Sequence, residues 1–286
     1  MSTPPDPNPR APRVPVPPGA CDCHFHVTGG LSRLVAARSY TPADTPMADY
    51  RRMRRALGLS RGVLVQSSTN GTDNRTLLNA LAEDETLRGI AVVDSDSDVA
   101  ALRALAAQGV VGCRGNMLFS SDARLQDLPG FTHRLAEAGM HLQLLVDASL
   151  AEGLEALVAG SPVPVVLDHM GHVLAARGVA DPGFQTVLRL LETGKLWVKL
   201  SGAYRIAPQD MAAAAPMARA LIAARPDRLV WGSDWPHPAI GGLMPNDGAL
   251  MDQLFDWAGP QLAARILVEN AETLYSFPAW EPVHDA

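Results

Sequence analysis

The sequence predicts an α/β protein that folds as a (β/α)8 barrel, the TIM-barrel fold, with extra helices at its C-terminus. Short apolar runs of strand length alternate with segments of helical periodicity along the chain. Eight such strands can be counted, enough to close a parallel barrel, and 286 residues suit a fold that typically takes about 250. A doubly wound open sheet competes, but it usually has a glycine-rich phosphate turn after its first strand, which this sequence lacks.

Two regions differ in composition. Residues 1–18 are rich in proline, so we expect an extended N-terminal arm. Residues 19–286 are expected to form one catalytic barrel domain.

The overall composition limits the partners. Hydrophobic residues make up 47% and charged residues 19%, which allows a large core. The net charge of -6 and the lack of a basic stripe argue against nucleic acid. No apolar run is long enough to span a membrane, and no signal-peptide pattern is present. Three cysteines suit a reducing compartment, so we expect a cytoplasmic protein, as a monomer or a homo-oligomer.

The first half of the chain supplies four predicted strands and the helices after them. In the helix 47–57, Met47, Tyr50, Met53 and Leu57 lie on one face, and Gly58 ends it. Ser97 is expected to cap a later helix. The predicted strands are 21–27, 62–66, 89–93 and 110–113, and the further helices are 74–82 and 97–107.

The second half repeats the pattern. The predicted strands are 141–146, 163–167, 196–200 and 228–233, and the helices are 130–138, 150–159, 183–192, 211–224, 250–257 and 262–275.

The first strand carries two histidines. His24 and His26 should point the same way, because side chains alternate along a strand. The same alternation places Cys21 and Cys23 on the opposite face, where we expect core residues rather than metal ligands.

Polar residues gather at the predicted C-terminal strand ends, which meet at one site in such a barrel. Chance would scatter them, so they predict a catalytic site. We expect His133, His141, His172 and His284 to be ordinary structural or surface residues. The set at the strand ends is His24, His26, Ser67, Arg114, His169, Arg205 and Asp234.

Three motifs in order resemble the amidohydrolase superfamily: His-x-His at 24–26, Asp-His-Met-Gly at 168–171 and Ser-Asp-Trp-Pro-His at 233–237. More narrowly, they resemble its branch of pyrone-dicarboxylate and other carboxylated-lactone hydrolases. The likeness also includes Tyr40-Thr-Pro, Val65-Gln-Ser, Gly71-Thr-Asp-Asn and Lys199-Leu-Ser-Gly.

The resemblance bears on metals. Many members hold one or two divalent ions, using a bridging lysine or glutamate on strand four. Here strand four offers Arg114 and strand five offers Gln143, so a binuclear centre is not expected. We expect no metal; the alternative is a single Zn²⁺ on His24, His26, His169 and Asp234.

The resemblance implies that a carboxylated lactone or pyrone ring is hydrolysed in aromatic or sugar-acid catabolism. Asp234 would activate water, and His24, His26 and His169 would polarise the carbonyl. Arg114 and Arg205 would bind substrate carboxylates, with Tyr40, Ser67 and His237 as further hydrogen-bond donors. The alternative for His237 is that it only orients Asp234.

One departure concerns the substrate. The pyrone-dicarboxylate type has another arginine shortly after strand four, whereas here the next is Arg124. If Arg124 does not reach the site, a ring with a single carboxylate fits better. A zinc-dependent decarboxylase, a lactone isomerase and a non-catalytic barrel that binds anions are the alternatives.

Overall fold

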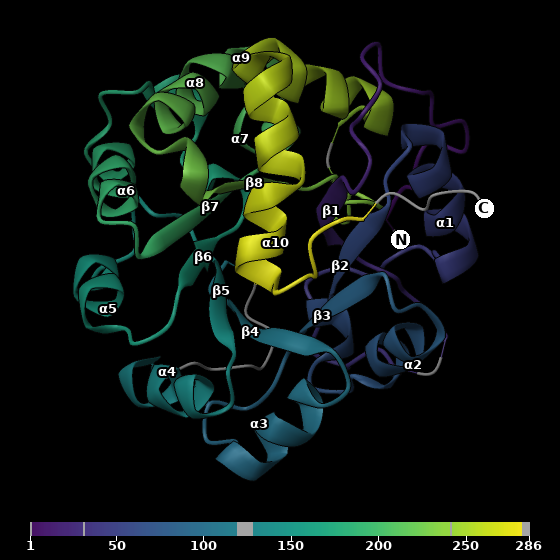
Figure 1. Cartoon of the computed structure of the whole chain (residues 1–286), viewed down its shortest axis with the longest axis vertical. Helices are drawn as coiled ribbons and strands as arrows, with labels where there is room; N and C mark the ends of the chain where they lie inside the picture. The colour runs from purple at the N-terminus through teal and green to yellow at the C-terminus, as the bar shows by residue number, and fades with distance from the viewer. Residues whose placement is uncertain (1, 31, 119–127, 241, 282–286) are drawn as a thin grey trace.

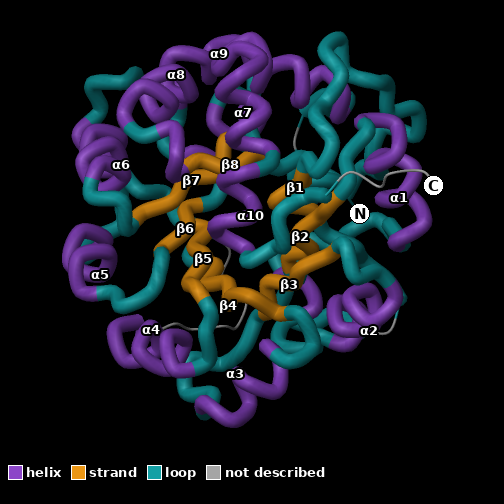
Figure 2. The backbone as a smooth tube through the Cα atoms, viewed as in Figure 1, coloured by secondary structure: helices purple, strands orange, loops and turns teal. Residues whose placement is uncertain are grey.

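Eight parallel strands lie side by side in chain order and are surrounded by helices in the computed structural model (Figures 1 and 2). The structure describes residues 2–30, 32–118, 128–240 and 242–281. The predicted (β/α)8 barrel is confirmed. The strands are β1 (Cys21–Phe25), β2 (Arg61–Val65), β3 (Leu87–Ala91), β4 (Val110–Asn116), β5 (His141–Leu145), β6 (Val165–Leu167), β7 (Leu196–Leu200) and β8 (Leu229–Trp231).

The helices follow the prediction with shifted ends. Helix α1 has the predicted bounds, and Gly58 ends it with a φ of 77°. The Ser97 cap is wrong: Asp98 caps α3, because its carboxylate accepts from Ala101 N at 2.7 Å. The helices are α1 (Met47–Leu57), α2 (Arg75–Glu83), α3 (Val99–Ala106), α4 (Leu128–Glu137), α5 (Leu154–Gly160), α6 (Pro182–Glu192), α7 (Ala203–Ile206), α8 (Ala215–Ala224), α9 (Asp247–Leu267) and α10 (Glu269–Tyr275).

The predicted break between the last two helices is confirmed. Gly259 takes a φ of 70° and a ψ of 167°, outside the helical region, and Pro260 follows, so the path of α9 is interrupted between residues 257 and 262. The segment after this kink runs to Leu267, and α10 begins at Glu269.

The barrel closes between the residues after β8 and strand β1. Asp234 N donates to His24 O, and His26 N donates to Trp235 O, both at 2.7 Å. The Ser233 hydroxyl also donates to Asp22 of β1 at 2.6 Å. This closure places the last-strand aspartate beside the first-strand histidines.

The barrel interior is apolar at the N-terminal ends of the strands, where α10 closes it (Figure 2). Cys21 and Cys23 belong to this inner cluster, together with Tyr275 of α10. They are core residues as predicted, but their predicted direction is wrong. An irregularity between Asp22 and Phe25 breaks the alternation, so the sulfurs share the interior with His24.

The N-terminal arm is bound to the barrel along α9. The Arg10 guanidinium pairs with Asp252 at 2.5 Å, and Arg13 pairs with Asp252 and Asp256. Asn246, at the start of α9, donates to Asp6 at 2.8 Å. At the tip of the arm, Ser2 N donates to Thr41 O, next to Tyr40.

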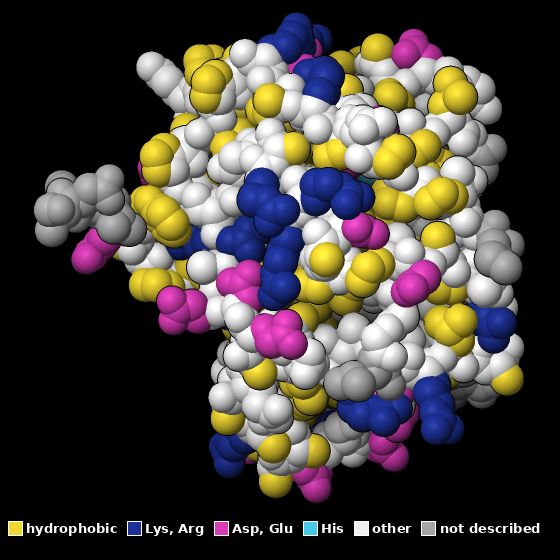
Figure 3. All heavy atoms as spheres, turned by 90° about the vertical axis from the view of Figure 1, so that its right-hand side faces the viewer, with side chains coloured by type: hydrophobic (Ala, Val, Ile, Leu, Met, Phe, Trp, Pro, Cys, Tyr) yellow, Lys and Arg dark blue, Asp and Glu magenta, His cyan; other side chains and the backbone are white. Residues whose placement is uncertain are grey.

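Figure 3 shows the side that carries α1 and α2, where Lys and Arg side chains gather with Asp and Glu side chains among them. Within the described residues, no helix is both long and apolar enough to cross a membrane.

Candidate active site

A pocket with about 320 Å³ of space opens at the C-terminal ends of the strands. Its walls carry histidine, arginine and aspartate side chains, as the strand-end pattern predicts. The lining residues are His26, Tyr40, Ser68, Arg114, Asn116, Leu145, His169, His172, Arg205, Asp234, Pro238 and Ala239.

Asp234 turns away from its strand with a φ of 63°. Its Oδ2 accepts from the Tyr204 hydroxyl and from Arg205 Nε, both at 2.5 Å. Its Oδ1 has no hydrogen-bond partner in the described part of the chain. Burial is the largest single influence and raises the pKa of Asp234, but Arg205 and the neighbouring histidines together outweigh it and hold the pKa well below its ordinary value. Asp234 is therefore ionised, with one oxygen available to the pocket.

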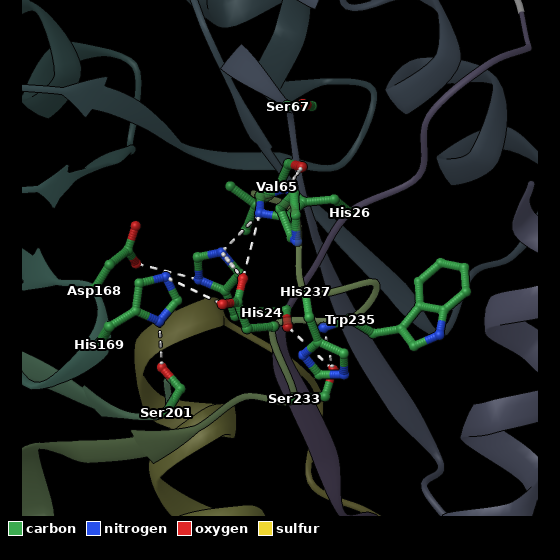
Figure 4. Close-up of polar contacts among 12 residues, drawn as sticks. His24, His26, Val65, Ser67, Asp168, His169, Ser201, Ser233, Trp235 and His237 are labelled. Atoms are coloured by element: carbon green, nitrogen blue, oxygen red, sulfur yellow. Dashed lines mark hydrogen bonds and ion pairs between the residues drawn. The ribbon is translucent and has the colours of Figure 1, made fainter. Parts of the chain in front are cut away.

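The His24 and His26 rings meet through their Nε2 atoms, 3.2 Å apart (Figure 4). His26 Nδ1 lies 2.7 Å from the Val65 carbonyl, which can only accept, so the neutral ring carries its proton there. His24 must then supply the proton between the two Nε2 atoms. Burial lowers the pKa of His24 to about 4, and lowers that of His26 well below its ordinary value.

Lys199 and Asp168 both contact the other nitrogen of His24. The Lys199 ammonium lies 2.9 Å from Cys23 O, 2.8 Å from Gln143 Oε1 and 3.2 Å from His24 Nδ1, and Asp168 Oδ1 is also 3.2 Å from His24 Nδ1. One partner only donates and the other only accepts, so the proton on His24 Nε2 follows from His26, whose Nε2 accepts.

Residues after β6 form a left-handed turn. His169, Met170, Gly171 and His172 all have positive φ, from 50° to 73°. The turn points both histidines toward the pocket, with ring centroids 5.4 Å apart. His169 Nδ1 lies 2.9 Å from the Ser201 hydroxyl, and its Nε2 lies 3.7 Å from Asp234 Oδ2.

The prediction for His172 is wrong, because this residue lines the pocket. Its buried Nε2 has no hydrogen-bond partner among the described residues, and burial lowers the pKa of His172 to about 4. The left-handed turn, which sequence alone does not reveal, brings it into the site. His141 packs against Tyr275 and His133 is exposed, as predicted, whereas His284 lies outside the described residues.

The site carries an excess of positive charge. Arg114 Nε donates to Asp168 Oδ2 at 3.0 Å, and Lys199 lies 3.4 Å from Asp168 Oδ1. With Arg205 on Asp234, three cationic side chains face two carboxylates. Because the histidines are neutral, the site has about one net positive charge, which suits an anionic ligand.

The remaining predicted residues divide into two groups. Tyr40, Arg114 and Arg205 line the pocket as expected, although Arg205 also holds Asp234. Ser67 does not line it; its hydroxyl bonds Thr69 at 2.8 Å, and the neighbouring Ser68 faces the pocket. Arg124 lies outside the described residues.

His237 is also absent from the pocket wall. It is fully buried, with Nδ1 3.0 Å from the Tyr204 hydroxyl and Nε2 3.1 Å from Asp247 Oδ1. Tyr204 lies between His237 and Asp234, which fits the alternative that His237 orients Asp234.

Sequence reasoning missed the side chains that support the site: Lys199, Tyr204 and Asp247. A lysine inside the apolar strand Leu196–Leu200 was the available signal, since a buried charge needs partners. Tyr204 lies in the single-turn helix α7 and Asp247 is the first residue of α9, so no periodicity predicts the direction of either side chain.

The donor set also fits a single divalent ion. Asp234 Oδ1 lies 3.7 Å from both His24 Nε2 and His26 Nε2. Together with the 3.2 Å between the imidazoles, these distances place the centre of the triangle about 2 Å from each atom, the length of a Zn–N or Zn–O bond. The unpartnered Asp234 Oδ1 is consistent with such a ligand. His169 does not belong to this group of three: its Nε2 lies 3.7 Å from Oδ2, the other oxygen of Asp234.

Comparisons with known proteins agree with this geometry. Residues 21–277 match the model of the amidohydrolase family. The chain is 35% identical to a 4-sulfomuconolactone hydrolase from Hydrogenophaga intermedia, covering 92% of this chain and 90% of that protein. It is 33% identical to a 2-pyrone-4,6-dicarboxylate hydrolase from Comamonas testosteroni, covering 94% and 93%.

A solved structure is similar over the same span. It is a probable 2-pyrone-4,6-dicarboxylic acid hydrolase from Acinetobacter baumannii with citric acid bound. The TM-score is 0.80 at 27% identity, covering 91% of this chain and 100% of the other.

Proposed function

This chain belongs to the amidohydrolase family, and we propose that it is a hydrolase that opens a lactone ring carrying an acid group. The observation that carries the proposal is Asp234: one oxygen is held by Tyr204 and Arg205, and the other is available to a pocket lined by histidines and arginines. The relatives named above act on lactone or pyrone rings with acid substituents, which supports the same reaction class here.

In the proposed reaction, Asp234 Oδ1 takes a proton from water, and the water oxygen adds to the lactone carbonyl carbon. The tetrahedral intermediate collapses with cleavage of the ring C–O bond. The proton passes from Asp234 to the ring oxygen, and the product is a hydroxy acid, or its keto form where the ring oxygen was enolic.

The proposed roles of the histidines differ from the expectation that His24, His26 and His169 all polarise the carbonyl. His169 can donate from Nε2 to the developing oxyanion, because its Nδ1 can accept from Ser201. His26 Nε2 is an acceptor, since its proton is held by Val65 O. We therefore assign the His24–His26 pair to orienting the water beside Asp234, and the oxyanion to His169.

The acid group of the substrate is assigned to Arg114 and His172. Both arginines line the pocket and pair with a carboxylate through Nε, but Arg205 Nη2 also donates to Pro238 O, which favours Arg114 as the group that binds the acid. The neutral His172 beside it can donate one further hydrogen bond. This arrangement suits a small ring with one carboxylate, or with a second, less charged acceptor group.

A zinc-dependent reaction of the same family, such as decarboxylation, is the second candidate, and the triangle of His24, His26 and Asp234 favours it. A bound ion would act as a Lewis acid toward the substrate carbonyl. The positive charge already supplied by Arg114, Lys199 and Arg205 disfavours a further dication, so the metal-free reaction is the first proposal.

Acid release from a panel of carboxylated lactones and pyrones tests the proposal, with ring absorbance followed in parallel. Asp234→Asn should lower turnover by about three orders of magnitude or more if Asp234 is the base. Asp96→Asn, at an exposed aspartate, is the matched control. Ring conversion without acid release would identify an isomerase, and carbon dioxide release a decarboxylase.

A further inference from the structure

We infer that Tyr204 and His237 are positioning residues: with Asp247 behind them, they hold Asp234 so that only Oδ1 faces the substrate. The inference rests on the proposed role of Asp234 as the base. None of these three supporting residues lines the pocket, so their effect must pass through Asp234.

The direction of the chain follows from which atoms can donate. Tyr204 O and Asp234 Oδ2 are 2.5 Å apart, and an ionised carboxylate only accepts, so the phenol proton lies on this bond. The Tyr204 oxygen is then an acceptor for His237 Nδ1–H, 3.0 Å away.

Asp247 lies behind His237. Its Oδ1 is 3.1 Å from His237 Nε2 and both side chains are fully buried, but neither atom has a hydrogen-bond partner among the described residues. The proton on His237 Nδ1 therefore follows from the Tyr204 oxygen, whose own proton lies on the bond to Asp234.

The position of Asp247 is itself fixed by its place in the fold. It is the first residue of α9, where the helix dipole favours a negative charge. The preceding Asn246 caps the helix by accepting from Gly248 N at 3.1 Å, and it donates to Asp6 and to Asn8 O of the arm.

The consequence is an asymmetric carboxylate. Two donors occupy Asp234 Oδ2, whereas Oδ1 has no hydrogen-bond partner among the described residues. Loss of the Tyr204 hydroxyl would let Asp234 rotate about its Cβ–Cγ bond, so fewer molecules would present Oδ1 correctly. The expected result is a lower kcat with little change in KM, since substrate does not touch Tyr204.

Two matched variants of His237 test the chain. In His237→Asn the side-chain amide lies where Nδ1 was and still donates to Tyr204, whereas His237→Leu cannot donate. Both remove Nε2, so both affect Asp247 equally. We expect kcat of His237→Leu to be about tenfold below that of His237→Asn, and KM to agree within about twofold.

The same pair in a Tyr204→Phe background provides the decisive comparison. Without the hydroxyl, the two His237 variants should have equal kcat, a non-additivity that a merely structural role would not produce. Equal kcat values in the Tyr204 background, or the same ratio in both backgrounds, would overturn the inference.

Thermal unfolding shows which variants are folded. If either His237 variant is unfolded, Tyr204→Phe alone decides: a tenfold lower kcat at unchanged KM supports the inference, and an unchanged kcat overturns it. Asp234→Asn separates the two proposals. If that variant stays active, the assignment of Asp234 as the base is wrong. If it is inactive while the two His237 variants show no coupling to Tyr204, only the positioning role of Tyr204 and His237 is wrong.

Discussion

His24 Nε2 lies 3.2 Å from His26 Nε2, so two imidazole nitrogens face each other inside a buried site. Two lone pairs at that distance would repel, so either a proton or a cation must lie between them. His26 Nδ1 donates to Val65 O, so His26 Nε2 accepts and the proton lies on His24 Nε2. We therefore expect the purified enzyme to keep its activity after treatment with a chelator and dialysis.

Elemental analysis of the same sample checks this expectation. Lys199→Met provides a matched test, because it removes the donor to His24 Nδ1 and leaves Asp168, 3.2 Å away, to accept a proton from that nitrogen. This variant should bind zinc more tightly than the wild type. Stoichiometric zinc in the wild type, with activity lost on chelation, would instead assign His24, His26 and Asp234 as ligands.

The barrel could be predicted because its evidence is local. Apolar strands ending in polar residues, such as the run that ends at Asp234, need only periodicity to be recognised. The predicted neighbours Asp234, His24 and His26 meet because barrel closure joins the last strand to the first. The sequence could not show the irregularity in β1 that turns Cys21 and Cys23 inward, because alternation assumes a regular strand.

The missed residues depend on backbone conformations that ordinary periodicity excludes. His172 reaches the pocket through four successive left-handed residues, a conformation that non-glycine residues seldom adopt. A similar reason explains why the prediction named Ser67 although Ser68 lines the pocket: a turn after β2 directs the Ser68 side chain there. Such errors concern the direction of a side chain rather than the choice of strand.

His172 is expected to contribute to substrate binding. Its Nε2 is buried without a partner among the described residues, on the same pocket wall as Arg114. His172→Phe keeps the ring but removes the hydrogen bond, so KM should rise about tenfold for acid-bearing rings while kcat changes less. His133→Phe, at an exposed histidine, is the control. An unchanged KM would show that His172 does not contribute to substrate binding.

The pH dependence of kcat/KM should be unusual for a histidine-rich site. Burial lowers the pKa of His24 and of His172 to about 4, and Asp234 is ionised well below its ordinary pKa. As the pH falls, His24 and His172 gain protons only near pH 4 and Asp234 lower still, whereas a solvated histidine does so near about 6.5. We expect kcat/KM to be nearly constant from about pH 5 to 8, measured by ring absorbance. An acid limb near pH 6.5 would contradict neutral, buried histidines.

Gly248 tests whether the arm contributes to stability. A Cβ on this residue would overlap the Arg10 carbonyl oxygen, so Gly248→Ala should push the arm away from α9 and weaken the Arg10–Asp252 pair. Alanine favours a helix by about 1 kcal/mol over glycine, so any loss of stability must come from the displaced arm.

Gly160→Ala is the matched control, because its Cβ would meet open space at the end of α5. We expect the Tm of Gly248→Ala to fall by about 2–4 °C, with faster proteolysis within residues 2–18, while Gly160→Ala is unchanged or more stable. Equal Tm values for the two variants would show that the arm adds nothing to the stability of the barrel.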